Sequence, residues 1–324
     1  MKRKKNIALI GAGYWGKNHL RNLFQLGVLH SVLDTNDAVI AQRAKDFPDV
    51  DFVKDEKVIR EDPAVKAVVI ATPAETHGSL VKRFIQAGKD VFVEKPLSLT
   101  VEQGEGLVEL AEDENRILMV GHILQYHSAV QKLKEIIDFG DMGEIRYLYS
   151  NRLNLGKLRV EENVLWSFAP HDISVVLMLM NGREPQSVEA FGGSYITSGI
   201  YDTTVTKMEF SNNVKCHIYV SWLHPFKEQK LIVIGSRKMA VFDDVSSEKL
   251  VLFPYKVDIQ EGKIPITQKV EYYIVNTEHT EPLKQELLHF IECIEDRKTP
   301  KTDGREGLRV LRVLEKAQES LKTG

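Results

Sequence analysis

The sequence predicts an α/β protein of two domains: an amino-terminal doubly wound parallel sheet, then an α+β domain with a large, mostly antiparallel open sheet. Three observations predict this. Short apolar runs alternate with amphipathic stretches over the first 120 residues, alternating strand patterns dominate after about residue 123, and 324 residues exceed the usual size of one domain. We expect the first domain to span 1–122 and the second 123–324.

In the first domain, five nearly uninterrupted apolar runs indicate strands that are buried on both faces of a parallel sheet. The stretches between them have helical periodicity, and Thr100 with Gln103 fits a capping box before the last one. The expected strands are 6–10, 31–34, 67–71, 90–93 and 117–120, and the expected helices are 15–26, 38–47, 76–87 and 101–114.

In the second domain, alternating strands joined by short turns predict an antiparallel meander with helices on one face. The other face is expected to be free, and Tyr195, Tyr219 and Trp222 on it suggest a subunit interface. The expected strands are 145–152, 187–195, 203–210, 215–222, 230–234, 239–242 and 270–274, and the expected helices are 129–138, 169–180, 283–297 and 305–321.

Composition excludes several classes of protein. Lys and Arg number 43 against 46 Asp and Glu, so the net charge of −3 gives no general attraction to nucleic acid or an anionic membrane. Two cysteines, Cys216 and Cys293, exclude a disulfide framework or a cysteine-rich zinc site. The apolar run after the basic amino terminus is too short for a signal peptide, and no run approaches a membrane span. We expect a soluble, cytoplasmic protein.

A glycine-rich turn between the first strand and helix predicts a dinucleotide site. Gly11, Gly13 and Gly16 form G-x-G-x-x-G, with Tyr14 and Trp15 inside it. The glycines suit a tight turn, a close approach of pyrophosphate and close helix packing, with the pyrophosphate on the helix amino terminus. Asp34 follows the second strand, where a carboxylate binds the ribose hydroxyls and repels a 2′-phosphate. The spacing therefore predicts a Rossmann domain that prefers NAD over NADP.

Two further segments follow strands at the same edge of the sheet. Thr72 and Pro73 come after one strand, with His77 in the next helix, and Glu94-Lys95-Pro96 comes after another. The Lys95–Pro96 bond can be cis, which could direct Lys95 into the cleft. A partly buried lysine near a cationic nicotinamide ring should lose basicity, which suits proton transfer.

Together, the glycine turn, Asp34, Ala71-Thr72-Pro73 with His77, and Glu94-Lys95-Pro96 resemble the Gfo/Idh/MocA oxidoreductase family over nearly the whole chain. The resemblance implies that Lys95 contacts substrate and cofactor, and that Thr72, Pro73 and His77 lie along the dinucleotide. It also implies a homodimer or homotetramer formed through the open sheet.

The family usually has D-x-x-x-H on a helix of the second domain, with the histidine as acid or base. Here His171 matches, but Ser167 stands in the place of the aspartate. Because Pro170 lies between them, we expect a loop that leads into a helix, with Pro170 in its first turn. Hydride transfer needs a base for the hydroxyl proton, and either His171 or Lys95 can serve. Lys95 would also stabilise a developing alkoxide.

The substrate is expected to be a sugar. Polar residues after a strand suit a hydroxyl-rich ligand, and Arg152, Lys157 or Arg159 could hold a carboxylate or phosphate. This part of the chain resembles the branch that acts on nucleotide-linked sugars, including UDP-N-acetylglucosaminuronate 3-dehydrogenases. The candidate substrate-binding residues are Lys95, Tyr126, Arg152, Asn154, Asn163, Trp166 and His171.

Three alternatives stay open: a dehydrogenase of myo-inositol or another free polyol, a redox-neutral NAD-dependent glycosidase, and a non-catalytic NAD-binding regulator. The regulator is favoured by Ser167 and disfavoured by Lys95 and His171. No metal is expected, because the histidines have no recognisable ligand spacing and hydride transfer needs no Lewis acid.

Overall fold

The computed structural model describes residues 4–156, 158–258 and 266–323. The chain forms two compact units. The first consists of the residues through Ile123 together with Glu281–Leu311, and the second of Leu124–Thr280 and the residues from Arg312 onward. Lys157, one of the candidate substrate residues, lies outside the described residues.

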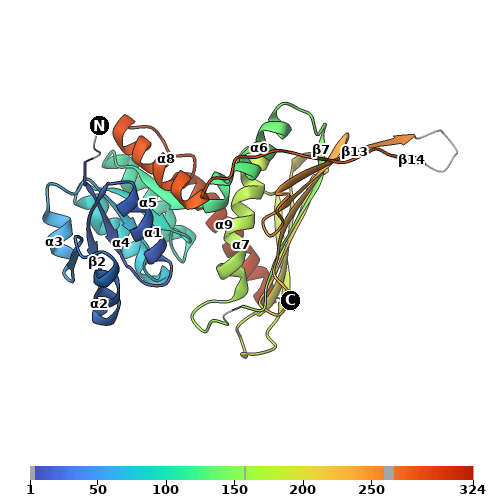
Figure 1. Ribbon diagram of the computed structural model, residues 1–324. Coiled ribbons are helices and arrows are strands. Elements are labelled where there is room, and N and C mark those ends of the chain that lie inside the picture. Colours follow the sequence, from blue (N-terminus) through green and yellow to red (C-terminus); the bar gives the residue numbers. More distant parts are fainter. Residues whose placement is uncertain (1–3, 157, 259–265, 324) are drawn as a thin grey trace. The chain divides into compact units, whose positions relative to one another are not determined.

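The first unit, which includes the blue to blue-green part of the chain (Figure 1), contains a parallel sheet. Its six strands follow the order β3-β2-β1-β4-β5-β6, which is the order of a Rossmann fold. Most residues of the four inner strands are buried and apolar, as the uninterrupted runs predict. The strands are β1 (Ile7–Ile10), β2 (Leu29–Leu33), β3 (Asp51–Val53), β4 (Ala67–Ile70), β5 (Asp90–Glu94) and β6 (Leu118–Gly121).

Helices cover both faces of this sheet. Val91 and Val93 of β5 join a core with Phe84 and Leu107 of two helices, whereas Phe92 points the other way, to Phe290. The helices are α1 (Gly16–Gln25), α2 (Asp37–Asp46), α3 (Glu56–Glu61), α4 (Ala74–Gln86), α5 (Val101–Asp113), α8 (Pro282–Asp296) and the first part of α9 (Gly304–Thr323).

Two features of this unit differ from the expectation. The sequence pattern missed β3 and α3, which are short and largely exposed at their ends. The expected division at residue 122 also assigns α8 to the second domain, whereas the structure groups α8 with the first. The physical reason is packing, since α8 lies against α1 and Phe290 contacts Phe92.

The second unit contains a nine-stranded sheet. Its main path is β14-β13-β12-β11-β7-β10-β9-β8, and β15 pairs with β13. All pairs are antiparallel except β7 with β10, so the sheet is mostly antiparallel but is not a simple meander. The strands are β7 (Ile145–Leu153), β8 (Ser187–Gly193), β9 (Thr203–Glu209), β10 (Lys215–Ser221), β11 (Glu228–Gly235), β12 (Lys238–Asp243), β13 (Leu250–Asp258), β14 (Ile266–Lys269) and β15 (Tyr273–Ile274).

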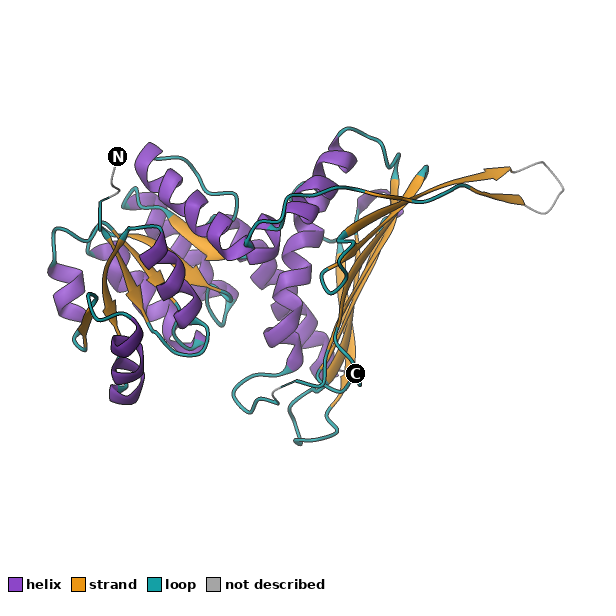
Figure 2. Cartoon of the chain, in the orientation of Figure 1, coloured by secondary structure: helices purple, strands orange, loops and turns teal. Residues whose placement is uncertain are grey.

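Helices lie against one face of this sheet and leave the other bare (Figure 2). These helices are α6 (Ser128–Asp138), α7 (Val164–Leu179) and the end of α9. Two short helices, η1 (Ile123–Tyr126) and η2 (Ser211–Asn213), occur in addition. The expected interface residues do not share one environment. Tyr195 is exposed and Tyr219 half-buried, but the prediction for Trp222 is wrong, because this side chain is 1% exposed and belongs to the core.

Among the described helices, none combines the length and the apolar character that crossing a membrane would require.

Candidate functional site

The glycine-rich turn has the geometry that a dinucleotide needs. Gly11 has φ +90°, and a Cβ there would lie 2.8 Å from Cγ2 of Thr72. A Cβ on Gly16 would collide with the carbonyl oxygen of Gly11, whereas one on Gly13 would meet nothing within 4 Å. Helix α1 begins at Gly16 with no side-chain cap from Trp15. The turn is thus closed on its protein side and open where a pyrophosphate would approach.

Asp34 directly follows β2 and is tied to this turn. One carboxylate oxygen accepts from the backbone N–H of Ala12 at 2.8 Å, and the other from that of Asn36 at 2.9 Å. Arg43 of α2, which the sequence pattern did not single out, donates its Nε to the carbonyl of Ala12 at 3.0 Å. The turn therefore carries one fixed carboxylate and one fixed guanidinium group, and both fit the adenosine end of a dinucleotide.

Glu94, at the end of β5, joins the glycine-rich turn to the strand edge. Its Oε1 accepts from Nε1 of Trp15 at 2.6 Å and lies 2.7 Å from Nε2 of His19. Burial alone would raise the pKa of Glu94. The hydrogen bond and charge of His19, the Trp15 bond and the charge of Lys95 outweigh it, so the pKa lies below its usual value. Glu94 is thus an anion beside Lys95.

His77 of α4 is 1% exposed, and its ring lies between the loop that contains Thr72 and the loop that contains Pro96. Its Nδ1 lies 2.7 Å from the carbonyl oxygen of Pro96, and its Nε2 lies 2.9 Å from that of Thr72. The Lys95–Pro96 bond is cis, and Lys95 itself is half-buried. The imidazole thereby fixes the Thr72-Pro73 segment against the segment that carries Lys95.

In the second unit, His171 lies within α7 and not at its start. The prediction of a loop that ends near Pro170 is wrong, because the helix begins at Val164 and runs through Pro170. The reason is a cap that the prediction overlooked: the side chain of Asn163 accepts from the N–H of Trp166 at 3.3 Å. Ser167 and His171 therefore lie one turn apart on one helical face.

Arg152 is occupied by a neighbour of His171. Its Nε donates to Oδ2 of Asp172 at 2.6 Å and its Nη2 to Oδ1 at 3.3 Å, and Oγ of Ser150 donates to Oδ1 at 2.6 Å. Both members of this ion pair are buried. The guanidinium group predicted for substrate is thus directed to Asp172, where it fixes β7 to α7.

The remaining candidates are spread along α7 and its neighbours. Asn163 and Trp166 both donate to Oε1 of Gln318, at 2.8 Å and 3.1 Å. Asn154 continues the sheet beyond β7 through its N–H to the carbonyl of Ser221. Tyr126 is buried on η1.

Because β7 and β10 are parallel, their carboxyl ends meet at one edge of the sheet. The described residues of the loop after β7, 154–156 and 158–163, include several predicted residues. The loop after β10, residues 222–227, lies at the same edge and presents Phe226, which is 61% exposed, beside Lys227. This second loop has no local sequence signal, since only the parallel pairing of β7 with β10 brings it to this edge.

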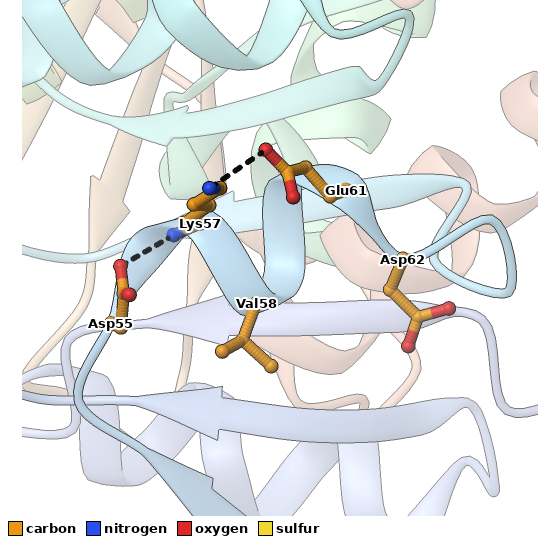
Figure 3. A pocket seen from close by; sticks show the side chains of 5 residues that line it. All are labelled: Asp55, Lys57, Val58, Glu61 and Asp62. Carbon is orange, nitrogen blue, oxygen red and sulfur yellow. Dashed lines mark hydrogen bonds and ion pairs between the residues drawn. The ribbon is translucent and has the colours of Figure 1, made fainter.

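A shallow pocket of about 400 Å³ lies elsewhere, around α3 (Figure 3). Its lining contains none of the predicted residues, and it is open to solvent and rich in carboxylates. The lining residues are Asp55, Lys57, Val58, Glu61 and Asp62.

Nowhere in the described ranges do three or more His, Cys, Asp or Glu side chains form a group that could hold a metal ion.

Two family models match the chain. Residues 5–122 match the model of an oxidoreductase family with an NAD-binding Rossmann fold, named GFO_IDH_MocA, and residues 130–241 match the GFO/IDH/MocA C-terminal domain. Together the two matches span most of both structural units.

Individual proteins similar to this chain over nearly its whole length are also oxidoreductases or have the same fold. UDP-N-acetylglucosamine 3-dehydrogenase from Acidithiobacillus ferrooxidans is 27% identical over 94% of this chain and 93% of its own length, and one of its structures has a TM-score of 0.86 over 98% and 97% of the two chains. The scyllo-inositol 2-dehydrogenase (NAD(+)) of Bacillus subtilis is 26% identical over 93% and 89%. A protein of known structure from Magnetospirillum magnetotacticum MS-1 is 30% identical, with a TM-score of 0.82 over 97% and 100%.

Proposed function

The chain belongs to the Gfo/Idh/MocA family of NAD-binding oxidoreductases, and from that premise we propose that it oxidises one ring hydroxyl of a nucleotide-linked sugar to a ketone, with NAD as the hydride acceptor. The observation that carries this proposal lies at the carboxyl edge of the first sheet, where the glycine-rich turn, Asp34 and the Glu94–Lys95 segment come together. The nucleotide-linked sugar is favoured by the relative from Acidithiobacillus, which matches almost end to end.

The residues of the first unit fit a dinucleotide. The open space at Gly13 and the uncapped start of α1 would hold the pyrophosphate, and Asp34 would bind the ribose hydroxyls. The bound cofactor supplies the hydride acceptor. Asp34 also favours NAD over NADP, because its carboxylate repels a 2′-phosphate.

Two residues of the chain act on the substrate hydroxyl group in this proposal. Lys95, beside anionic Glu94, stabilises negative charge on the substrate oxygen, and His171 on α7 accepts the proton. The assignment follows ordinary basicity, since a neutral imidazole is the better base near pH 7. The other substrate residues proposed are Asn154, Asn163, Trp166 and Tyr126. Arg152 is assigned a supporting role instead, because it holds Asp172, the neighbour of His171.

The test is NADH formation with a panel of sugars. UDP-N-acetylglucosamine and UDP-N-acetylglucosaminuronate should give NADH, and Lys95→Ala should abolish turnover while NAD still binds. Absence of NADH with both nucleotide sugars would exclude the proposed substrate class. Steady NADH accumulation would also exclude a redox-neutral glycosidase.

A free polyol is the second candidate, favoured by the inositol dehydrogenase of Bacillus subtilis. The same assay with myo-inositol and scyllo-inositol distinguishes it. If the inositols react and both UDP-sugars do not, the second candidate replaces the first.

We further propose that the bare face of the second sheet binds a second copy of this chain. Half-buried apolar side chains follow one another across neighbouring strands: Val241, Ile232 and Tyr149 pair in register, and Tyr149 stacks on His217 at 5.3 Å. The same row continues through Lys207 to Glu189, so the face carries both signs of charge and can complement itself in a two-fold dimer.

A further inference from the structure

Glu286 is a buried carboxyl group that the proposed chemistry does not use. It lies on α8 in the first unit and is 0% exposed. Within the described part of the chain, neither of its carboxyl oxygens has a hydrogen-bond partner. Since an ionised carboxylate without donors is strongly disfavoured in a protein interior, this side chain requires a physical explanation.

The position of Glu286 is defined by aromatic contacts. Phe290 lies one turn further along α8 on the same face, and its ring meets that of Phe92 edge to face at 5.7 Å. Phe92 also contacts His19 at 5.4 Å, and it shares a face of β5 with Glu94, two residues later. The face of α8 that carries Glu286 therefore packs where His19 and Glu94 meet.

The groups that act on Glu286 are mostly acidic. Besides burial, the charges of Glu94 on β5 and Glu306 on α9 raise the pKa of Glu286 well above its usual value. Glu306 is itself bound to Nδ1 of His122 at 2.5 Å, and Glu94 to His19. Of Glu94 and Glu286, Glu286 is therefore the one that binds its proton more tightly, because its pKa is raised and that of Glu94 is lowered.

Glu94 and Glu286 can each take part in a further hydrogen bond. Oε1 of Glu94 receives the bonds of both Trp15 and His19, whereas Oε2 receives neither. A neutral carboxyl group on Glu286 carries an O–H that can serve such an acceptor. We propose that Glu286 is a positioning residue that acts on Lys95 through Glu94, by supplying a hydrogen-bond donor behind the Glu94 carboxylate.

The consequence for Lys95 follows from charge. A hydrogen bond donated to Glu94 draws negative charge away from its carboxylate, which weakens the attraction between this carboxylate and the ammonium group of Lys95. Loss of the donor leaves that charge unshared, so Lys95 binds its proton more tightly. The importance of this effect for catalysis rests on the proposed role of Lys95, but the effect itself does not.

The experiment measures Lys95 without turnover. Only a neutral amine reacts with an acylating reagent, so the pH dependence of Lys95 labelling in the full-length protein, followed by peptide mass spectrometry, reports its pKa. Glu286→Met removes the donor at similar volume, and Glu286→Gln retains one. We expect labelling of Lys95 at pH 8 to slow roughly threefold in the Met variant, half a pH unit, and to remain at the wild-type rate in the Gln variant.

Glu292→Gln, an exposed position on α8, is the matched control and should change nothing. Equal Lys95 labelling in the wild type, Met and Gln variants, or an equal shift in both variants, would overturn the inference. If the Met variant does not fold, infrared spectroscopy decides: the band of a protonated carboxyl group in the wild type at pH 7 must disappear in Glu286→Gln. Its persistence would overturn the inference as well.

The same samples separate this inference from the proposed function. A shift in Lys95 labelling with no NADH formed from any sugar would retain the inference and reject the sugar dehydrogenase. NADH formation with unchanged labelling would do the reverse.

Discussion

Asp34 is the residue on which the choice between NAD and NADP is expected to depend. Asp34→Asn keeps an acceptor for the N–H of Ala12 but removes the charge that repels a 2′-phosphate. We expect the ratio of the NADP to the NAD dissociation constant to fall about tenfold, about 1.4 kcal/mol, as measured by fluorescence titration of both cofactors. An unchanged ratio would mean that another group, such as Arg43, sets the preference.

Glu286 gives a prediction for stability against pH. The folded protein keeps the Glu286 proton above the pH at which the unfolded chain loses it, because its folded pKa is raised. The folded state then binds more protons than the unfolded one, so stability falls as pH rises from about 4.5 toward the folded pKa. Glu286→Gln removes this loss.

Within that window, the advantage of the Gln variant in free energy of unfolding should grow by about 1.4 kcal/mol for each pH unit. Urea unfolding of both proteins at several pH values measures it. A constant difference between them across pH would show that Glu286 ionises normally.

At the scale of elements, the start of α7 depends on Asn163. Asn163→Ala removes the cap and should lower the free energy of unfolding by about 1 kcal/mol. Asn163→Asp keeps the cap but loses the amide that donates to Gln318, so it isolates the second contact. Urea unfolding of the three proteins compares them, and equal stability of the Ala variant and the wild type would contradict the capping role.

The same element shows what sequence reasoning could and could not predict. Long periodic helices and buried parallel strands were placed within a few residues, because their patterns are local. The predicted start of α7 is too late, since Pro170 suits a first helical turn, whereas in the structure Asn163 already caps the helix. Glu286 had a signal that was overlooked: it falls between Leu283 and Leu287 on the apolar face of α8, where a charged residue is unusual.

The candidate site could be predicted only where its residues are close together in the sequence. The glycine-rich turn and Asp34 follow from strand–turn–helix geometry, and the structure joins them through Ala12. The pairing of Arg152 with Asp172 depends on how α7 packs on its sheet, and the burial of Trp222 likewise depends on tertiary packing. The pairing of β7 with β10 joins segments about 70 residues apart. No local pattern encodes these contacts.

At the scale of the whole molecule, the bare sheet face predicts the oligomeric state. Tyr149→Glu places a charge in the middle of the proposed interface and should convert a dimer or tetramer into smaller species. Sedimentation velocity measures this, with Lys298→Glu, an exposed position on the first unit, as the control. A wild type that sediments as a monomer would reject the second-copy proposal.

The return of α8 to the first unit also affects the order in which the protein can mature during synthesis. The ribosome releases Phe92 and His19 early, but Phe290, which packs on Phe92, emerges nearly 200 residues later. Until then one face of the nascent cofactor domain lacks its cover. A growing chain would therefore depend on chaperones longer than a domain completed in one stretch, and premature termination before residue 281 would leave a cofactor domain that is incomplete although every residue of its fingerprint is present.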